Sequence, residues 1–164
     1  MTDRTHGQQT SGATDHDIFR AAYPRMRRYA AVVAPPHIEP EDLLQDALAA
    51  TLKKHCLVDL DNAEFYLRRV MVNLASNQRR RWIRRKKAHQ LLAASSDRPA
   101  ESYPSDLSEL MWLTSRQRAV LYLNEVEGYP FAEIAEMLGC SVPAARMSAM
   151  RARRRMRDAL GAEA

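Results

Sequence analysis

The chain has 164 residues, of which 46% are hydrophobic and 27% charged, a composition typical of a globular protein with one or two small domains. Its formal net charge of +5 favours a polyanionic partner. No segment approaches the roughly 18 consecutive apolar residues of a membrane span, and the N-terminus lacks the apolar centre of a secretory signal, so we expect a cytoplasmic protein. Two widely separated cysteines, Cys56 and Cys140, predict neither a disulfide framework nor a zinc site.

The first predicted element is an amphipathic helix that follows a polar leader. Residues 1–14 are aperiodic, and we expect them to be disordered. Apolar residues then recur at spacings of three and four from about Asp15 to Val33. Pro24 lies inside this segment and predicts either a kink or a break, because proline removes one backbone donor and crowds the preceding turn.

Two further helices are predicted before residue 93. Pro40 suits the first position of a helix whose apolar spacing continues to Leu52. Asp61 with Glu64 three residues later forms a capping-box pattern, which predicts the start of a third helix that continues into an arginine-rich segment. Hairpin turns and a sustained two-residue alternation are both missing from the sequence, so we predict an all-α fold.

A second helical unit follows a polar, proline-bearing linker. Thr114 with Gln117 forms another capping-box pattern, Gly139 supplies a tight turn, and Ser141 is placed to cap a last helix. Helix, glycine turn and helix is the helix-turn-helix pattern. The predicted organisation is a leader (1–14), a first helical domain (15–92), a flexible linker (93–108) and a helix-turn-helix domain (109–161).

Basic residues gather in two short segments, one in each predicted domain. The first surrounds Trp82, and the second lies on the last helix, where a helix-turn-helix protein enters the major groove. Together these segments predict nucleic-acid binding. Trp82 itself either stacks on an unpaired base or packs back on the helices as a half-buried anchor. The basic residues are Arg79, Arg80, Arg81, Arg84, Arg85, Lys86 and Lys87 in the first segment, and Arg146, Arg151, Arg153, Arg154, Arg155 and Arg157 in the second.

Acidic residues cluster at the start of the second predicted helix. Glu41 and Asp42 complement the positive end of the helix dipole. The acidic face continues to Asp46, and it could also dock a basic partner protein. Both interpretations stand at this point.

Three segments resemble the bacterial sigma-70 factors, and among them the extracytoplasmic-function (ECF) group, which keeps only regions 2 and 4. Residues 41–48 are similar to region 2.2, residues 62–81 to regions 2.3 and 2.4, and residues 113–142 to region 4. The three occur in the family's order and cover most of the chain. Trp82 among the arginines also resembles a SigE-like subgroup frequent in actinobacteria.

The resemblance implies a dissociable subunit of bacterial RNA polymerase that is not itself an enzyme and needs no cofactor or metal. Core RNA polymerase and promoter DNA would be its partners, and the linker would also allow an anti-sigma factor to bind. The implied core-polymerase-binding residues are Glu41, Asp42, Leu43, Gln45 and Asp46. The implied minus-10 DNA-binding residues are Asn73, Asn77, Arg80, Arg81, Trp82, Arg84 and Arg85. The implied minus-35 DNA-binding residues are Ser141, Arg146, Ser148, Arg151 and Arg154.

The recognition helix departs from the family pattern. The family's usual Gly-Thr-Val-Lys-Ser-Arg is replaced by Pro-Ala-Ala-Arg-Met-Ser at residues 143–148, so minus-35 recognition is expected to be weaker or directed at another sequence. The residues also allow other functions. A stand-alone helix-turn-helix regulator would leave residues 41–48 without a role, and a single-strand binding module would leave the second domain unexplained.

Overall fold

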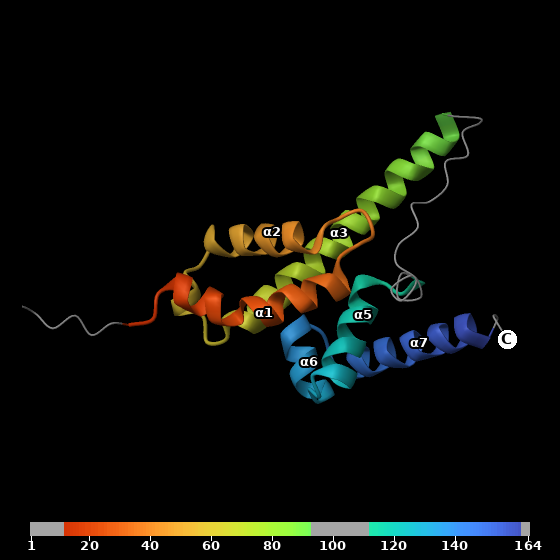
Figure 1. Cartoon of the computed structure of the whole chain (residues 1–164). Coiled ribbons are helices and arrows are strands. Elements are labelled where there is room, and N and C mark those ends of the chain that lie inside the picture. Colours follow the sequence, from red (N-terminus) through yellow and green to blue (C-terminus); the bar gives the residue numbers. More distant parts are fainter. Residues whose placement is uncertain (1–11, 93–111, 162–164) are drawn as a thin grey trace, which may run out of the picture.

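The computed structural model describes residues 12–92 and 112–161, and these ranges contain helices and no strand, which confirms the predicted all-α class (Figure 1). We call residues 12–92 the N-terminal module and residues 112–161 the C-terminal module. The predicted linker and most of the predicted leader lie outside the described residues.

Helix α1 (Asp15–Val33) begins at a complete capping box. The Asp17 backbone N–H donates to Thr14 Oγ1 at 3.3 Å, and the Asp17 carboxylate accepts from the Thr14 N–H at 3.0 Å. The helix continues through Pro24, so of the two alternatives at this proline the break is wrong. One face of α1 is buried in the core, and this face consists of Ala22, Met26, Tyr29, Ala30 and Val33.

Helix α2 (Pro40–Leu52) has Pro40 in its first turn, as predicted, and a short 3₁₀ turn, η1 (Leu57–Asp59), leads to α3 (Ala63–Leu92). The start of α3 corrects the sequence analysis. The Phe65 N–H donates to Asn62 Oδ1 at 3.0 Å, so Asn62 rather than Asp61 caps the helix.

The C-terminal module consists of α5 (Ser115–Leu121), a π-helical turn η3 (Tyr122–Val126), α6 (Phe131–Leu138) and α7 (Val142–Gly161). The predicted capping box of Thr114 and Gln117 is present, with Gln117 N–H to Thr114 Oγ1 at 3.2 Å. Gly139 adopts φ 62°, the left-handed conformation that lets the chain turn tightly from α6 into α7. The helix-turn-helix is therefore α6, this turn and α7.

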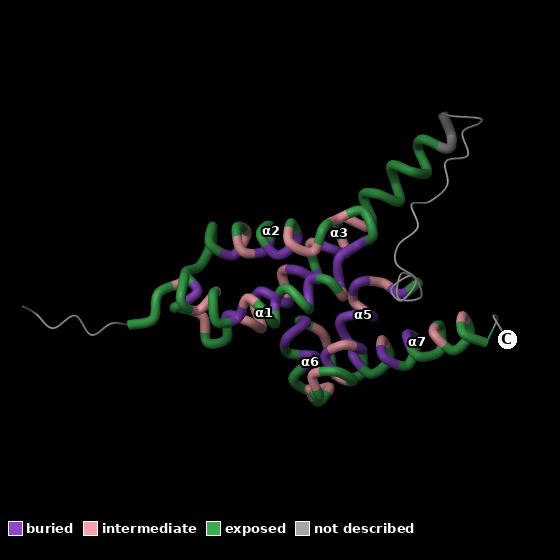
Figure 2. Tube along the Cα trace, in the orientation of Figure 1, coloured by how far each residue is buried: buried purple, intermediate pink, exposed green. Residues whose placement is uncertain are grey.

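One hydrophobic core continues through both modules. In the N-terminal module α1, α2 and α3 pack on one another, and α5 and α6 then pack against α1 and α3. Figure 2 shows this buried region, whereas residues 80–89 of α3 extend beyond it and are exposed. Within the described ranges, no helix combines the length and apolarity that a membrane span requires.

Candidate nucleic-acid interface

The distal half of α3 is a basic helix that projects from the core. The end of α3 projects from the other helices (Figure 1). Residues 80–89 are exposed and carry all the predicted basic residues of this segment except Arg79, which is half-buried. No acidic residue occurs between Glu64 and Asp97 to neutralise them. A bare helix of like charges repels itself, and binding to phosphates would relieve that repulsion.

Trp82 connects this basic helix to the rest of the N-terminal module. Its ring stacks on His37, from the connection between α1 and α2, with centroids 5.5 Å apart and planes 13° from parallel. Lys86 Nζ lies 5.1 Å from the Trp82 ring centroid. The side chain is nevertheless 40% exposed. These contacts favour the anchor interpretation of Trp82, because His37 already covers one ring face.

His37 is neutral more readily than an ordinary histidine. Partial burial lowers the pKa of His37, and the positive charge of Arg85 lowers it further. A neutral imidazole stacks on an indole ring without bringing a cation close to Arg85 and Lys86. The stack of His37 on Trp82 is therefore more stable at neutral and higher pH, where His37 is uncharged.

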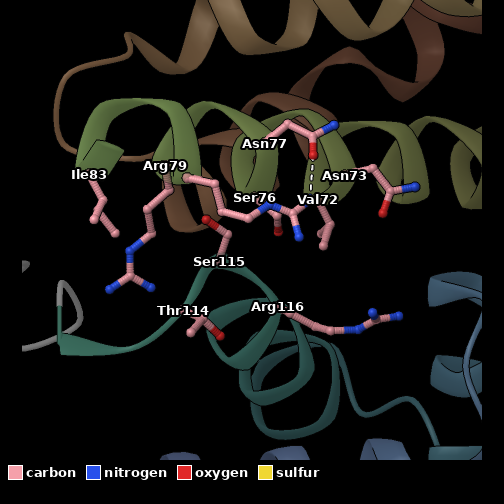
Figure 3. Close-up of a pocket in the computed structure, with 10 residues that line it drawn as sticks. Val72, Asn73, Ser76, Asn77, Arg79, Ile83, Thr114, Ser115 and Arg116 are labelled. Atoms are coloured by element: carbon pink, nitrogen blue, oxygen red, sulfur yellow. Dashed lines mark hydrogen bonds between the residues drawn. The ribbon is translucent and has the colours of Figure 1, made fainter. Parts of the chain in front are cut away.

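Three of the seven predicted minus-10 side chains border a cavity between α3 and α5. Asn73, Asn77 and Arg80 are exposed on α3, and an Arg80 Nη donates to Asn77 Oδ1. Figure 3 shows that Arg79 points from α3 toward α5. The cavity between the two helices has a volume of 610 Å³. The lining has no carboxylate; it consists of Val72, Asn73, Ser76, Asn77, Arg79, Arg80, Ile83, Thr114, Ser115 and Arg116. This wall is suited to a phosphate-bearing ligand. Arg81, Arg84 and Arg85 are exposed beyond it.

The acidic face of α2 is only partly available to a partner. Glu41 accepts hydrogen bonds from Tyr23 Oη at 2.8 Å and from Gln45 Nε2 at 2.9 Å, and these bonds hold the pKa of Glu41 below its usual value. Asp42 and Asp46 are exposed, and no ion pair to either is found among the described residues.

Leu43 is a correction to the predicted core-polymerase-binding set. Its side chain is 1% exposed and forms part of the core of the N-terminal module. Leu43 and the adjacent Leu44 both face the core, whereas Asp42, Gln45 and Asp46 lie on the outward side of the helix. The side chains that α2 presents to a partner are therefore those of Asp42, Gln45 and Asp46.

The five predicted minus-35 residues occupy different environments. Ser141 caps α7, since its Oγ accepts from the Ala144 N–H at 3.2 Å. The Arg146 guanidinium lies 6.0 Å from the Phe131 ring centroid, toward α6, and Ser148 is half-buried beside a cavity of 390 Å³ between α5 and α7. Arg151 and Arg154 are exposed, with Arg154 Nε 3.9 Å from Asp158.

Met147 and Met150 were missed by the sequence analysis. They are 41% and 54% exposed, although methionine is usually buried. The buried stripe of α7 is made by Ala145, Ala149 and Ala152, and both methionines project away from it. Helical periodicity is the one feature of the sequence that could have revealed them. If the three alanines mark the buried face of α7, then Met147 and Arg154 fall on the opposite, outward face of the helix.

Sequence reasoning also missed three arginines that join the modules: Arg68, Arg69 and Arg118. Arg68 and Arg118 are buried, and all three contact the other module. No sequence signal marks these contacts, because the partners in the other module lie more than fifty residues away and are mostly backbone carbonyls. In the described ranges, no group of three or more His, Cys, Asp or Glu side chains is arranged to hold a metal ion.

Comparisons with known proteins place the chain in a family. Residues 109–156 match the family model described as Sigma-70, region 4. The chain is 31% identical to the RNA polymerase sigma-E factor of Streptomyces coelicolor over 153 residues, which cover 88% of this chain and 84% of that protein. It is 26% identical to the ECF RNA polymerase sigma factor SigM of Mycobacterium tuberculosis over 152 residues, covering 88% and 76%.

The fold also matches a solved structure. The sigma factor RpoE of Bartonella quintana, determined in complex with the anti-sigma factor NepR, superposes with a TM-score of 0.66 at 23% identity, covering 89% of this chain and 96% of that one. The chain belongs to the sigma-70 family of RNA polymerase sigma factors, in its ECF group. The two helical modules are thus sigma region 2 and sigma region 4.

Proposed function

We propose that the chain is a dissociable sigma subunit that binds bacterial core RNA polymerase and directs initiation at promoters carrying its minus-10 and minus-35 elements. The observation that carries this proposal is the pairing of two DNA-suited surfaces in a chain of this family: the projecting basic helix of α3 and the helix-turn-helix of α6 and α7. In this role the chain works in the cytoplasm and has no catalytic step of its own, since nucleotidyl transfer belongs to the polymerase.

Each surface has a distinct task in this proposal. The exposed acids Asp42 and Asp46, with Gln45, dock on core polymerase. On α3, the amides of Asn73 and Asn77 hydrogen-bond to unpaired bases of the minus-10 element, as the Watson–Crick edge of an extruded base allows. The distal basic residues Arg80, Arg81, Arg84 and Arg85 hold the phosphates.

The recognition helix α7 reads the minus-35 element through a mixed surface. Arg151 and Arg154 are exposed and can reach guanine edges or phosphates. Met147 and Met150 offer apolar contact to thymine methyl groups, which arginine cannot provide. Arg146 is also exposed and can reach the DNA from the α6 side of the helix, whereas Ser148 is half-buried toward α5.

An inhibitor protein is a candidate partner in this proposal. The Bartonella neighbour was solved bound to an anti-sigma factor, and an anti-sigma factor of this chain would have the same two surfaces to cover.

Run-off transcription from a genomic fragment pool tests the proposal. Core polymerase is incubated with and without the purified chain, and the transcript starts are sequenced. We expect starts that require the chain and share paired upstream and downstream motifs. No such starts, together with tight binding of the chain alone to duplex DNA, would show a stand-alone helix-turn-helix regulator instead.

A further inference from the structure

The cavity between α3 and α5 gathers positive charge that no acid of its lining balances. Its volume of 610 Å³ is in the range of pockets that hold one small ligand. Arg79, Arg80 and Arg116 line it, without any aspartate or glutamate. Burial, and then the nearby positive charge of Arg79, lower the pKa of Arg118 to about 10. The cavity therefore has the positive potential that attracts an anion.

Several hydrogen-bond donors that line this cavity lack an acceptor. The side chains of Asn73, Ser76 and Arg79 form no hydrogen bond or ion pair with any other residue that the structure describes. Arg79 is nevertheless half-buried, and Figure 3 shows it pointing from α3 toward α5. A guanidinium has five N–H donors and no acceptor, so a ligand rich in acceptor oxygens would satisfy it. Phosphate groups match this requirement, because arginine binds them through two parallel hydrogen bonds.

The cavity is longer than one phosphate group. Its lining on α3 extends from Val72 to Ile83, which corresponds to ~16 Å of helix at 1.5 Å per residue. In Figure 3, Arg79 lies toward the Ile83 end, whereas the Arg116 side chain extends below Asn73 toward the other end. The ligand that fills this length has acceptors at the Arg79 end and a different group near Asn73 and Arg116.

The residues near the Asn73 end are suited to a nucleic-acid base. The Asn73 amide keeps both its donors and its acceptor available, and an asparagine amide pairs with the N6 and N7 positions of adenine. The Arg116 guanidinium is held by its bond to the Leu138 carbonyl at 2.7 Å. A planar guanidinium fixed in this way can stack on the face of a base.

We propose that this cavity is a binding site for one nucleoside triphosphate, with the phosphates on Arg79 and Arg80 and an adenine base beside Asn73 and Arg116. The inference goes beyond the proposed function, because it concerns a small ligand enclosed between two helices. Asn73 and Arg80 also belong to the proposed DNA wall of α3, whereas Arg79 and Arg116 do not.

The test is isothermal titration calorimetry on the full chain in magnesium-free buffer at fixed salt. Two probes are compared: ATP, and inorganic tripolyphosphate, which has the phosphates without the base. Arg79→Gln removes a cation from the cavity. Arg81→Gln is its matched control, because Arg81 is exposed on the same helix about 200° away and does not line the cavity. Asn73→Ala removes the proposed contact to the base.

We expect one ATP per chain. Arg79→Gln should weaken ATP and tripolyphosphate binding by roughly tenfold or more, since a hydrogen bond to a charged group is worth at least that factor. Arg81→Gln should change either affinity by less than about twofold. Asn73→Ala should weaken ATP binding by about fivefold, as expected for one neutral hydrogen bond, and leave tripolyphosphate binding unchanged. Circular dichroism of each variant checks that the helices are retained.

Three results would overturn the inference. The first is the absence of saturable ATP binding to the wild-type chain. The second is an equal loss in Arg79→Gln and Arg81→Gln, which would mean that ATP is attracted by the overall charge. The third is equal affinity of the wild-type chain for ATP and tripolyphosphate, which would mean that no base is recognised. Run-off transcription by the wild-type chain tests the proposed function separately, so a failure of either is recognised on its own.

Discussion

Asn62 and Asp61 show how a single residue decides where a helix begins. Both side chains can cap a helix, and they are adjacent, but only Asn62 Oδ1 accepts from the Phe65 N–H. Replacing a capping residue with alanine removes a bond from an otherwise orphaned donor and costs typically about 1 kcal/mol. We therefore expect Asn62→Ala to lower the free energy of unfolding in urea by about that amount.

Asp61→Ala is the control for this prediction. Asp61 is exposed, and no hydrogen bond or ion pair to its side chain is found in the described part of the chain. Its replacement should leave the urea midpoint within about 0.5 kcal/mol of wild type, as is usual for surface substitutions. Equal losses in the two variants would mean that Asn62 has no special role.

The His37–Trp82 stack gives a second prediction at this scale. Because the pKa of His37 is below its ordinary value of 6.5 in the folded protein, the folded chain binds fewer protons than the unfolded chain just below that pH. Stability from this group is therefore present above pH 6.5 and is lost as the pH falls through 6.5 toward the lowered value. In the Trp112→Phe variant, where Trp82 is the only tryptophan, we expect its emission to change with a midpoint below 6.5.

A His37→Phe version of the same variant keeps an aromatic partner for Trp82 and removes the titrating group. The emission change should then disappear. A midpoint at or above 6.5, or a change that persists in the phenylalanine variant, would assign the titration to another group.

At the scale of elements, the two halves of α3 have different roles. One face of its first half packs against α1 and α2, and its distal half carries the exposed arginines. We expect Arg80→Ala combined with Arg81→Ala to lower promoter opening more than core-polymerase binding. Two lost phosphate contacts should also reduce the slope of log affinity against log salt for single-stranded DNA by roughly 1.4, at about 0.7 per contact.

Arg20→Ala combined with Arg25→Ala removes the same charge from α1, away from the proposed DNA wall, and should leave that slope nearly unchanged. If the Arg80/Arg81 variant loses polymerase binding and promoter opening equally, the assignment of this segment to DNA is wrong.

The recognition helix α7 differs from a purely basic reading surface because Met147 and Met150 are exposed on it. A thymine methyl group buried against a methionine contributes about 0.8 kcal/mol, or roughly a fourfold change in affinity. Replacing the contacted thymine of the minus-35 element with deoxyuridine should weaken wild-type binding by about that factor. Met147→Ala with Met150→Ala should bind both DNAs equally.

The helices were largely predictable because their ends are encoded locally. The capping box at Thr114, the proline at Pro40 and the left-handed turn at Gly139 each act within a few residues, so sequence alone located them. Leu43 was assigned to the surface because a motif does not state its helical phase. The roles of Arg69 and Arg118 were unpredictable, because their acceptors are backbone carbonyls of distant residues and any sequence carries such carbonyls.

At the scale of the whole molecule, the described residues of both modules share one hydrophobic core. Two modules connected only by a linker would instead each have a separate core. We expect a single cooperative unfolding transition, because buried contacts such as Arg68 with Glu127 couple the modules. Urea curves from Trp112→Phe, which reports on Trp82, and from Trp82→Phe, which reports on Trp112, should coincide. In an Arg118→Met background they should separate.

The arginine contacts between the modules have a further consequence for how this protein can change. The acceptors at the ends of α1 and α6 are main-chain oxygens, and they persist whatever side chains occupy Val32, Val33 or Glu136. Apart from the ion pair of Arg68 with Glu127, compatibility between the two halves at these contacts therefore depends on a few donors and on helix geometry. A chimera that joins this N-terminal half to the C-terminal half of a relative should still fit together, provided that the relative has an arginine at the position of Arg118 and a glutamate at the position of Glu127.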